Sequence, residues 1–474
     1  MVVPINRIPP EVLALIPDFL DVDDRDEDVI ALTHVCRAWR EVFTSRPSLW
    51  THLDLDYQDE VEASVYLERS KSMPIQLSLD REDLILPSDT FFQIIPRVVG
   101  RLGHLVVRGT PENIQHITNH LSRPAPLLEH LTISVYSKSL SHRHPVFTPT
   151  LFDGDLSSLR SLDLGSIRTE LPWRNMVNLT TFSLRHTPPG ETSVGHLLDF
   201  FESAPHLREV SLYFATPTSG VQNGRLVSLA HLRMMRIVNR RPSSVLLDHL
   251  LIPAGAELVL QADFVSSLVG DLLPRCLNNL RNLSNFTTVK QYIGGRSPCM
   301  ELSGPNGRVR VNPTAPRISK TSLVLEFLLQ LDTSKTERFR IENGEPLSED
   351  LFYRALLRMI DLRVVTLYRC HNPHIFIRAL YPSTSSSEAV ICPKLEELVL
   401  VLRYDGDVFD MENVIGMAEA RASRGKELET VRIVDGGNEL DPKDVLELRR
   451  HVGHVEYSPR SMNDGEEGGR GGSW

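Results

Sequence analysis

The sequence is poor in cysteine and contains no long apolar run. Its five cysteines lie far apart and form no C-x-x-C pair, so neither a disulfide framework nor a zinc site is indicated, and we expect reduced core residues. No uninterrupted apolar stretch approaches the ~20 residues that span a bilayer. Residues 1–7 also lack the basic start and the apolar run of a secretory signal. These absences predict a protein of the cytosol or the nucleus that does not enter a membrane.

The chain has no excess of positive charge either. Its 51 Lys and Arg residues face 61 Asp and Glu residues, a formal charge of −10, which argues against wholesale binding of phosphate. We therefore expect no nucleic-acid partner, although a local basic patch is compatible with this total. At 474 residues, 41% of them hydrophobic, the chain is too long for one ordinary core and favours several domains or a repeat array.

The motifs of common catalytic sites are also missing. The sequence contains no G-x-S-x-G elbow, no H-E-x-x-H helix and no G-x-x-x-x-G-K-[ST] phosphate loop. His142 and His144 come nearest to a metal cluster, followed by Cys370, His371 and His374, but neither group has a spacing that fixes a metal geometry. We predict no catalytic residue, no metal ligand and no cofactor, and therefore a protein that is not an enzyme.

The first fifty residues predict a small group of short helices. Proline opens the first helix, and its apolar residues follow helical spacing as far as Pro17, which lacks the N–H that would bond the carbonyl four residues earlier and so divides or kinks the helix. A second amphipathic helix is predicted from Val29 to Phe43. Pro47 then opens a short turn that ends at Trp50. So few helices bury only a marginal core. Either a partner covers an exposed apolar face of these helices, or the helices cap a repeat array. The pattern alone slightly favours the cap.

Three motifs in this region resemble an F-box. They are I-P-P-E-V-L at residues 8–13, H-V-C-R-A-W-R-E-V at residues 34–42 and P-S-L-W-T-H-L at residues 47–53. The stretch L-E-R-S-K-S-M-P-I at residues 67–75 resembles the segment directly after the F-box in a large family of basidiomycete (mushroom-type) fungal proteins. The combination is more specific than any one of its pieces.

The resemblance implies a trihelical F-box at residues 1–52 that binds the Skp-type linker of a cullin-RING (SCF-type) ubiquitin ligase. Linker and cullin are then the expected partners, and a variable carboxy-terminal region selects an unknown protein substrate. Pro17 departs from the family, which usually keeps this helix unbroken. The residues that match the linker-binding part of the family by position are Ile8, Pro9, Val12, Leu13, Ile16, Leu20, Val35, Cys36, Trp39 and Trp50.

The rest of the chain repeats one pattern, L-x-x-[LVFM]-x-[LIV], whose alternation predicts a short strand. Successive matches begin 20 to 31 residues apart before a less regular stretch and 33 residues apart after it, which brackets a leucine-rich repeat. Helical stretches fall between many of the strands, as at residues 91–99, 194–201 and 351–360. We predict an α/β repeat fold over residues 53–460, an irregular leucine-rich-repeat-like solenoid with a parallel sheet. The clear matches begin at Leu102, Leu128, Leu159, Leu179, Leu207, Leu232, Leu362, Leu395 and Leu428.

A doubly wound α/β sheet is the competing architecture, because it too alternates strands and helices. The missing phosphate loop and the number of repeat matches favour the solenoid. Between residues 286 and 321 the period fails, and G-P-N-G at residues 304–307 predicts a β-hairpin, at about residues 296–312, that projects from the array. From Asn463 onward the sequence lacks core formers apart from Trp474, and we predict a disordered end at residues 461–474.

In such a solenoid the leucines enter the core, and the intervening strand positions form a sheet surface that can meet a substrate. The leading hypothesis is a substrate-recognition adaptor of a ubiquitin ligase. The second hypothesis is a free-standing repeat scaffold whose first helices only cap the array. The third is a hydrolase or transferase whose site these motifs do not reveal. Tyr and Arg are frequent anchors of protein interfaces. On that basis the candidate substrate-face residues are Tyr213, Arg236, Tyr368 and Arg432.

Overall fold

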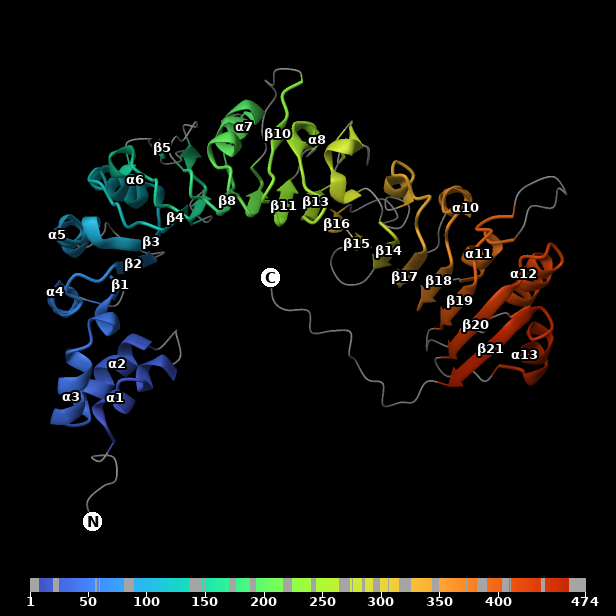
Figure 1. The fold of residues 1–474 in the computed structure, drawn as a ribbon, viewed down its shortest axis with the longest axis horizontal. Coiled ribbons are helices and arrows are strands. Elements are labelled where there is room, and N and C mark those ends of the chain that lie inside the picture. The colour runs from blue at the N-terminus through green and yellow to red at the C-terminus, as the bar shows by residue number, and fades with distance from the viewer. Residues whose placement is uncertain are drawn as a thin grey trace, which may run out of the picture. The chain divides into compact units, whose positions relative to one another are not determined.

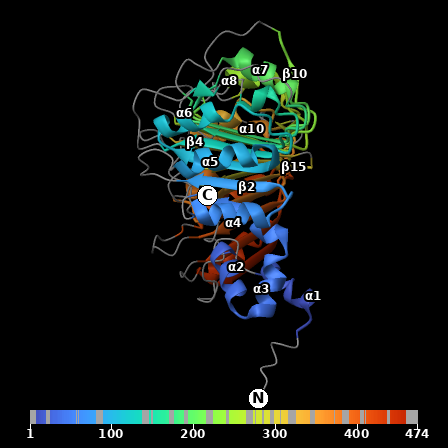
Figure 2. The ribbon, with the colours of Figure 1, turned by 90° about the vertical axis from the view of Figure 1, so that its left-hand side faces the viewer.

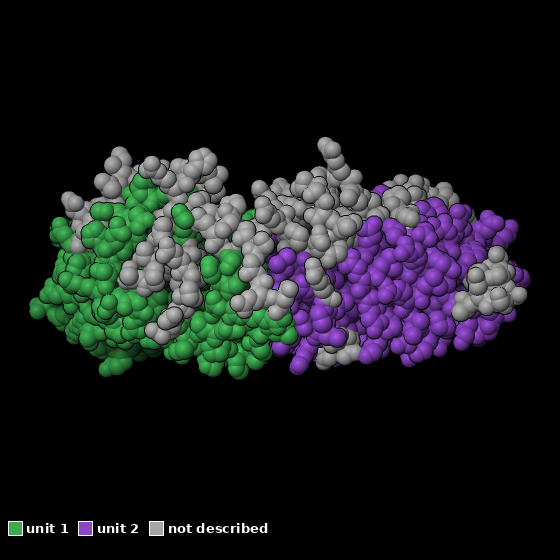
Figure 3. Space-filling model, turned by 90° about the horizontal axis from the view of Figure 1, so that it is seen from above, with its two compact units in different colours: residues 1–231 green, residues 232–474 purple. Residues whose placement is uncertain are grey.

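The computed structural model divides the chain into two compact units, unit 1 with residues 1–231 and unit 2 with residues 232–474 (Figure 3). Leu20, His142, His144 and the tail predicted at residues 461–474 lie outside the described residues. The structure describes residues 8–19, 25–55, 58, 60–80, 89–136, 146–147, 151–169, 176–187, 193–215, 224–239, 244–263, 273–274, 276–283, 286–292, 299–305, 307–314, 325–342, 349–371, 373–381, 390–402, 409, 411–435 and 440–459.

Short helices open unit 1, and α1, α2 and α3 lie together at one end of it (Figure 2). The α-helix that the prolines open stops at Leu13, and a 3-10 turn that contains Pro17 begins at Ile16, so the division predicted at this proline is confirmed. The elements are α1 (Pro10–Leu13), η2 (Ile16–Phe19), α2 (Arg25–His34), α3 (Arg37–Thr44) and η3 (Pro47–Trp50).

The single helix expected from Val29 to Phe43 was wrong, because the chain breaks between α2 and α3. Cys36 is fully extended, with φ −162° and ψ 175°. The break frees a carbonyl at the end of α2, and the Arg40 side chain supplies its donor, with Nε 3.0 Å from the Thr33 oxygen. Apolar periodicity hides such a break, because the residues on both sides still turn toward the same core.

Unit 1 is built on a run of parallel strands that pair in the order of the sequence, β1-β2-β3-β4-β6-β8-β9. The longer helices α4, α5, α6 and α7 lie on one face of these strands (Figure 1). The strands are β1 (His52–Asp54), β2 (Ile75–Asp80), β3 (Leu102–Gly109), β4 (His130–Val135), β5 (Val146–Phe147), β6 (Ser161–Gly165), β7 (Arg168–Thr169), β8 (Thr181–Arg185), β9 (Glu209–Tyr213) and β10 (Val227–Ser228). The helical elements are α4 (Glu60–Arg69), α5 (Asp89–Val98), η4 (Val99–Arg101), α6 (Pro111–His120), η5 (Leu151–Gly154) and α7 (Val194–Ser203).

The strand register places the repeated leucines of unit 1 in straight columns. Leu77 pairs with Leu105, Leu105 with Leu131 and Leu131 with Leu162, and each of these side chains is at most 1% exposed. Residues alternate between the two faces of a strand, so one face is apolar and covered by helices while the other carries polar residues. The doubly wound alternative needs helices on both faces, and the described helices lie on one.

Unit 2 has the same layers, with α10 to α13 on one face of the strands (Figure 1). Its strands are ordered β11-β13-β16-β15-β14-β17-β18-β19-β20-β21, and only the pairs made by β15 are antiparallel. The strands are β11 (Met234–Asn239), β12 (Leu250–Leu251), β13 (Glu257–Asp263), β14 (Thr288–Tyr292), β15 (Cys299–Gly304), β16 (Gly307–Thr314), β17 (Arg338–Glu342), β18 (Val364–Tyr368), β19 (Glu397–Val401), β20 (Leu428–Asp435) and β21 (Val452–Pro459). The helical elements are α8 (Ser244–Leu247), η7 (Leu277–Asn279), η8 (Arg281–Leu283), α10 (Glu349–Arg358), α11 (Pro373–Arg378), α12 (Glu412–Ala422) and α13 (Pro442–Leu448).

The hairpin predicted around G-P-N-G forms, with β15 and β16 antiparallel and Gly304 opposite Gly307. Its expected projection from the array was wrong, because β16 pairs with β13 and β15 pairs with β14, which places both strands inside the sheet. Glycine is required at the turn, since a Cβ on Gly307 would collide with the carbonyl oxygen of Ala254.

None of the described helices is long and apolar enough to cross a membrane.

A buried arginine holds a turn in unit 2. Arg421 on α12 is 0% exposed, and its guanidinium donates to the carbonyls of Ile391 and Cys392 at 2.9 and 3.0 Å. Burial lowers the pKa of this arginine. Cys392 has a positive φ of 46°, a conformation that non-glycine residues rarely adopt, so the two hydrogen bonds hold a turn that its own backbone disfavours.

Arg421→Gln should lower the free energy of unfolding by about 2–4 kcal/mol, because the shorter amide leaves at least one of the two buried carbonyls without a donor. Arg449→Gln is the matched control on the exposed residue directly after α13, and it should change stability by less than about 0.5 kcal/mol. Urea denaturation of the full chain measures both. Equal midpoints for the two variants would contradict the role given to Arg421.

The five cysteines are free, but they are not all core residues as expected. Cys370 and Cys392 are buried, Cys36 and Cys299 are half-buried, and Cys276 is exposed. Burial raises the pKa of the Cys299 thiol to about 11 and that of the Cys392 thiol to about 12. The thiolate is the reactive form of cysteine, so burial suppresses reactivity through access and through ionisation.

Iodoacetamide at mildly alkaline pH should therefore modify Cys276 first in the native protein, and Cys392 only after denaturation. Mass spectrometry of tryptic peptides over a time course gives the rate at each site. The pattern would be contradicted by labelling of Cys392 in folded protein at the rate of Cys276. Urea-treated protein, in which all five thiols are accessible, is the control.

Candidate protein-binding surfaces

Three exposed apolar residues, Val12, Leu15 and Phe19, lie on α1, on the link after it and on η2, and we call them the apolar strip. Val12 and Leu15 are 51% and 53% exposed, and Phe19 is 86% exposed. Val35, which follows α2, is 50% exposed. Single exposed apolar residues are ordinary on a protein surface, but three within one short stretch form a surface that favours cover by a partner.

The other apolar residues of this segment build a small core. Leu13 and Phe43 are buried, and the Trp39 ring meets the Phe43 ring edge-on with 5.6 Å between centroids. The indole N–H of Trp50 donates to the Phe43 carbonyl at 3.0 Å, which satisfies a buried polar group at the end of α3. The residues that hold these helices together are therefore distinct from those of the apolar strip.

The ten residues predicted to bind the linker fall into different settings, and their binding role stays a prediction. Three are exposed, three are half-buried, three are buried and Leu20 lies outside the described residues. In that order they are Pro9, Val12 and Val35, then Ile8, Ile16 and Cys36, then Leu13, Trp39 and Trp50.

Leu15 and Phe19 were not among the predicted linker-facing residues, although they are the most exposed of the apolar strip. The sequence carried a signal for them in Pro17. A 3-10 turn rotates the chain differently from an α-helix, so the helical period no longer assigns faces beyond the point at which the proline divides the helix.

Trp50 joins the helical segment to the first strand and helix of unit 1. It is 1% exposed, its ring meets the Tyr66 ring edge-on at 4.9 Å, and the Arg69 guanidinium lies 4.3 Å from its centroid. Both partners belong to α4, and β1 follows Trp50 almost at once and pairs with β2. Residues on the two sides of the boundary predicted at residues 52/53 therefore pack tightly against each other.

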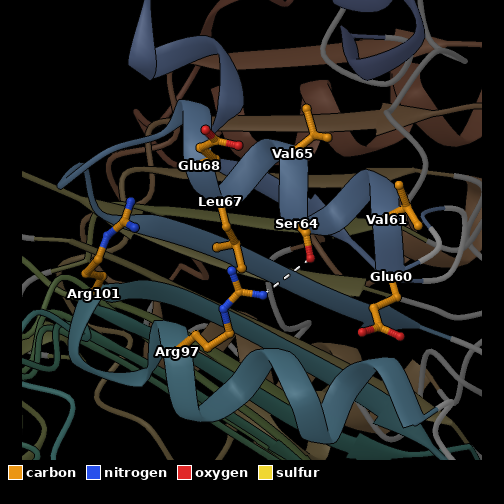
Figure 4. A pocket seen from close by; sticks show the side chains of 8 residues that line it. All are labelled: Glu60, Val61, Ser64, Val65, Leu67, Glu68, Arg97 and Arg101. Carbon is orange, nitrogen blue, oxygen red and sulfur yellow. Dashed lines mark hydrogen bonds between the residues drawn. The ribbon is translucent and has the colours of Figure 1, made fainter.

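A groove of about 740 Å³ lies on the helical side of unit 1, between α4 and the end of α5 with η4 (Figure 4). Its wall mixes carboxylates, guanidinium groups and apolar side chains, and Arg97 donates to the Ser64 hydroxyl at 3.3 Å. Arg101 is engaged with its own chain, because it donates to the Met73 carbonyl and to the Ser70 hydroxyl. The described residues that line this groove include neither histidine nor cysteine.

The uncovered sheet face of unit 1 is polar and largely paired. Arg185 of β8 bonds Asp163 of β6 at 2.5 Å, a contact repeated by Arg108 and Asp80 on β3 and β2. The His104 ring stands 5.2 Å from that of His130 on the next strand. Burial, and then the neighbouring histidines, lower the pKa of His104, so the neutral form of the His104 imidazole is favoured. Tyr213 ends β9 on the same face and is half-buried.

The other predicted substrate-face residues lie on the uncovered sheet face of unit 2. Arg236 is on β11, Tyr368 ends β18 and Arg432 is on β20. Arg432 is tied to Glu397 and Glu456 at 3.7 and 2.7 Å. Their role in substrate binding stays a prediction.

Lys290 and Arg340 lie on the middle strands of this face and were not among the predicted substrate-face residues. Their strands, β14 and β17, lie in the less regular stretch, where the leucine pattern gives no match. The available signal was plain alternation, as in R-F-R-I-E at residues 338–342, where polar and apolar residues change places at every step.

The structure brings together no metal-binding group of three or more His, Cys, Asp or Glu side chains within the ranges it describes. Cys370 is buried, with its Sγ 3.5 Å from the carbonyl oxygen of Ile341, while the adjacent His371 is exposed. These two adjacent side chains thus lie in different environments, and the third member of the candidate group, His374, is half-buried.

Residues 5–56 match the F-box-like family. The F-box-like segment therefore covers α1 to η3, the small core around Phe43 and β1, and it contains the whole apolar strip. No curated protein matches the chain.

A matched pair of serine substitutions separates the core of the F-box-like segment from its apolar strip. Leu13→Ser buries a hydroxyl and leaves a cavity, so local stability should fall by about 2–4 kcal/mol, whereas Phe19→Ser should change it by less than about 0.5 kcal/mol. Hydrogen exchange of peptides that span residues 8–50 measures both. Faster exchange in Phe19→Ser than in Leu13→Ser would contradict this assignment.

Proposed function

We propose that the protein is a substrate-recognition adaptor of an SCF-type ubiquitin ligase. The observation that carries the proposal is the coincidence of the F-box-like match with the apolar strip. F-box domains typically bind Skp-type linkers, and such a contact would cover Val12, Leu15 and Phe19. Cullin then follows as an indirect partner, and we expect the protein in the cytosol or the nucleus.

The energetics of the strip suit this role. Burying one large apolar side chain is worth about 1.5–3 kcal/mol, so three side chains on one short stretch supply a substantial part of a micromolar affinity. The core beneath them is complete without the partner, since Leu13, Phe43 and Trp50 are already buried. The strip is thus presented by a preformed surface, which lowers the ordering cost of association.

The remainder of the chain supplies the substrate-binding part of this proposal. Strands that follow one another in sequence also pair in sequence through unit 1, with the repeated leucines in register, which supports an irregular leucine-rich-repeat-like solenoid. The sequence resemblance to the mushroom-type fungal family supports the same architecture. In this role the protein positions a substrate beside a ligase, so it contributes proximity and no bond-making residues.

The contact of Trp50 with Tyr66 and Arg69 favours a second function, in which the first helices only cap a repeat scaffold. A cap needs buried contacts to the first repeat but no exposed apolar strip. The two functions therefore differ in whether the strip has a partner.

Titration of a purified Skp-type linker into the full chain should give a defined complex, and Phe19→Ser should weaken it by about tenfold or more, because each tenfold step is about 1.4 kcal/mol. Leu446→Ser is the matched control, an exposed leucine on α13 whose loss should change affinity by less than about twofold.

Isothermal titration calorimetry gives the affinities, and affinity purification tests whether cullin is recovered with the linker. A folded full chain that binds no linker would refute the adaptor function and leave the capped scaffold.

A further inference from the structure

The uncovered face of the unit 2 sheet carries a row of basic side chains that the strand register aligns. Lys290 on β14 lies opposite Arg340 on β17, and on its other side opposite Glu301 on β15, which in turn faces Arg310 on β16. Adjacent strands are about 4.8 Å apart, so these four side chains form one continuous line across the sheet. We call Arg310, Lys290 and Arg340 the basic row.

The charge of this face differs in sign from that of the chain. Five cations and two carboxylates occupy the outward positions of β14 to β17, whereas the whole protein has a formal charge of −10. Glu257 on β13 adds a third carboxylate 3.5 Å from Arg310. The cations are Arg308, Arg310, Lys290, Arg338 and Arg340, and the carboxylates are Glu301 and Glu342.

Ion pairs within the sheet do not neutralise the excess of positive charge on β14 to β17. Glu301 is shared between Arg310 and Arg308 at 3.2 and 3.5 Å, and Arg340 contacts Glu342 at 2.6 Å. Among the described residues, Lys290 has no acidic side chain within 4.0 Å. Lys290 and Arg340 are like charges on neighbouring strands, so an anion placed between them would lower their mutual repulsion.

An aromatic anchor borders the basic row. Tyr368 ends β18 next to Glu342 of β17, with the guanidinium groups of Arg340 and Arg369 at 5.1 and 5.3 Å from its ring centroid. Arginine presents a planar fork that fits a carboxylate with two hydrogen bonds, and Tyr and Arg are enriched at the centres of protein interfaces.

We propose that the basic row and Tyr368 bind an acidic segment of the substrate protein, an exposed stretch rich in Asp and Glu. The proposal rests on the adaptor function for the identity of this ligand as a substrate. Glu301 lies between Arg310 and Lys290, and Glu257 and Glu342 border the cations on β13 and β17. These carboxylates would repel a continuous phosphate backbone, while separate carboxylates can each meet one cation. This spacing favours a peptide over a nucleic acid.

The test is fluorescence anisotropy of the full chain with a short labelled peptide that alternates Glu and Ser, beside the same peptide with Gln for every Glu. Lys290→Glu removes the unpaired cation and places a carboxylate beside Arg340. The variant should keep the fold and should bind the acidic peptide more weakly, by about tenfold or more. Lys443→Glu makes the same charge change at an exposed position of α13 and should shift the affinity by less than about twofold.

Three results would overturn the proposal: equal binding of the Glu and Gln peptides, unchanged affinity in Lys290→Glu, or tighter binding of a single-stranded oligonucleotide or of a phosphoserine peptide than of the Glu peptide. The urea midpoint of Lys290→Glu confirms that the variant is folded. No linker is present in these titrations, so their failure leaves the adaptor function standing, and a failed linker titration leaves the acidic-peptide site standing.

Discussion

Parallel pairing in register is the constraint on which the rest of each unit depends. Because neighbouring strands keep the same alignment, Leu77, Leu105, Leu131 and Leu162 stack into one buried column, and every residue between such columns is forced outward. A shift of one residue would bury polar side chains and expose leucines. The same alignment also places the outward side chains in rows across the strands, so side chains from distant parts of the sequence become neighbours.

Regular parts of the sequence predicted the fold well, for reasons visible at particular residues. The helix expected at residues 194–201 is found as α7 (Val194–Ser203), and each clear leucine match runs into a strand, because period and burial coincide at these places. The break at Cys36 was not predictable from periodicity, since Val29 and Phe43 face one core from two separate helices. The hairpin was recognised from its turn, but its place inside the sheet depends on pairing with β13 and β14, which no local pattern encodes.

The candidate surfaces were predicted less completely than the fold. The sequence pointed to the first helix as a binding element, yet the resemblance alone did not separate buried Leu13 from exposed Phe19. That distinction depends on how a short 3-10 turn follows α1. Likewise, Arg340 and Lys290 stand far apart in the sequence, and only the register of β14 with β17 makes them adjacent. Composition gives only the total charge of −10 and does not show which charges strand pairing brings together.

The burial of Trp50 has a mechanical consequence for unit 1. A single rigid side chain belongs at once to the F-box-like segment, through the Phe43 carbonyl, and to the first strand and helix, through Tyr66 and Arg69. There is no slack between these two parts, so a protein held at the apolar strip would share the orientation of the β1–β2 end of the sheet. The F-box-like segment therefore has a fixed orientation relative to the first strands. The position of a protein bound to it is set by this packing and not by the length of a flexible linker.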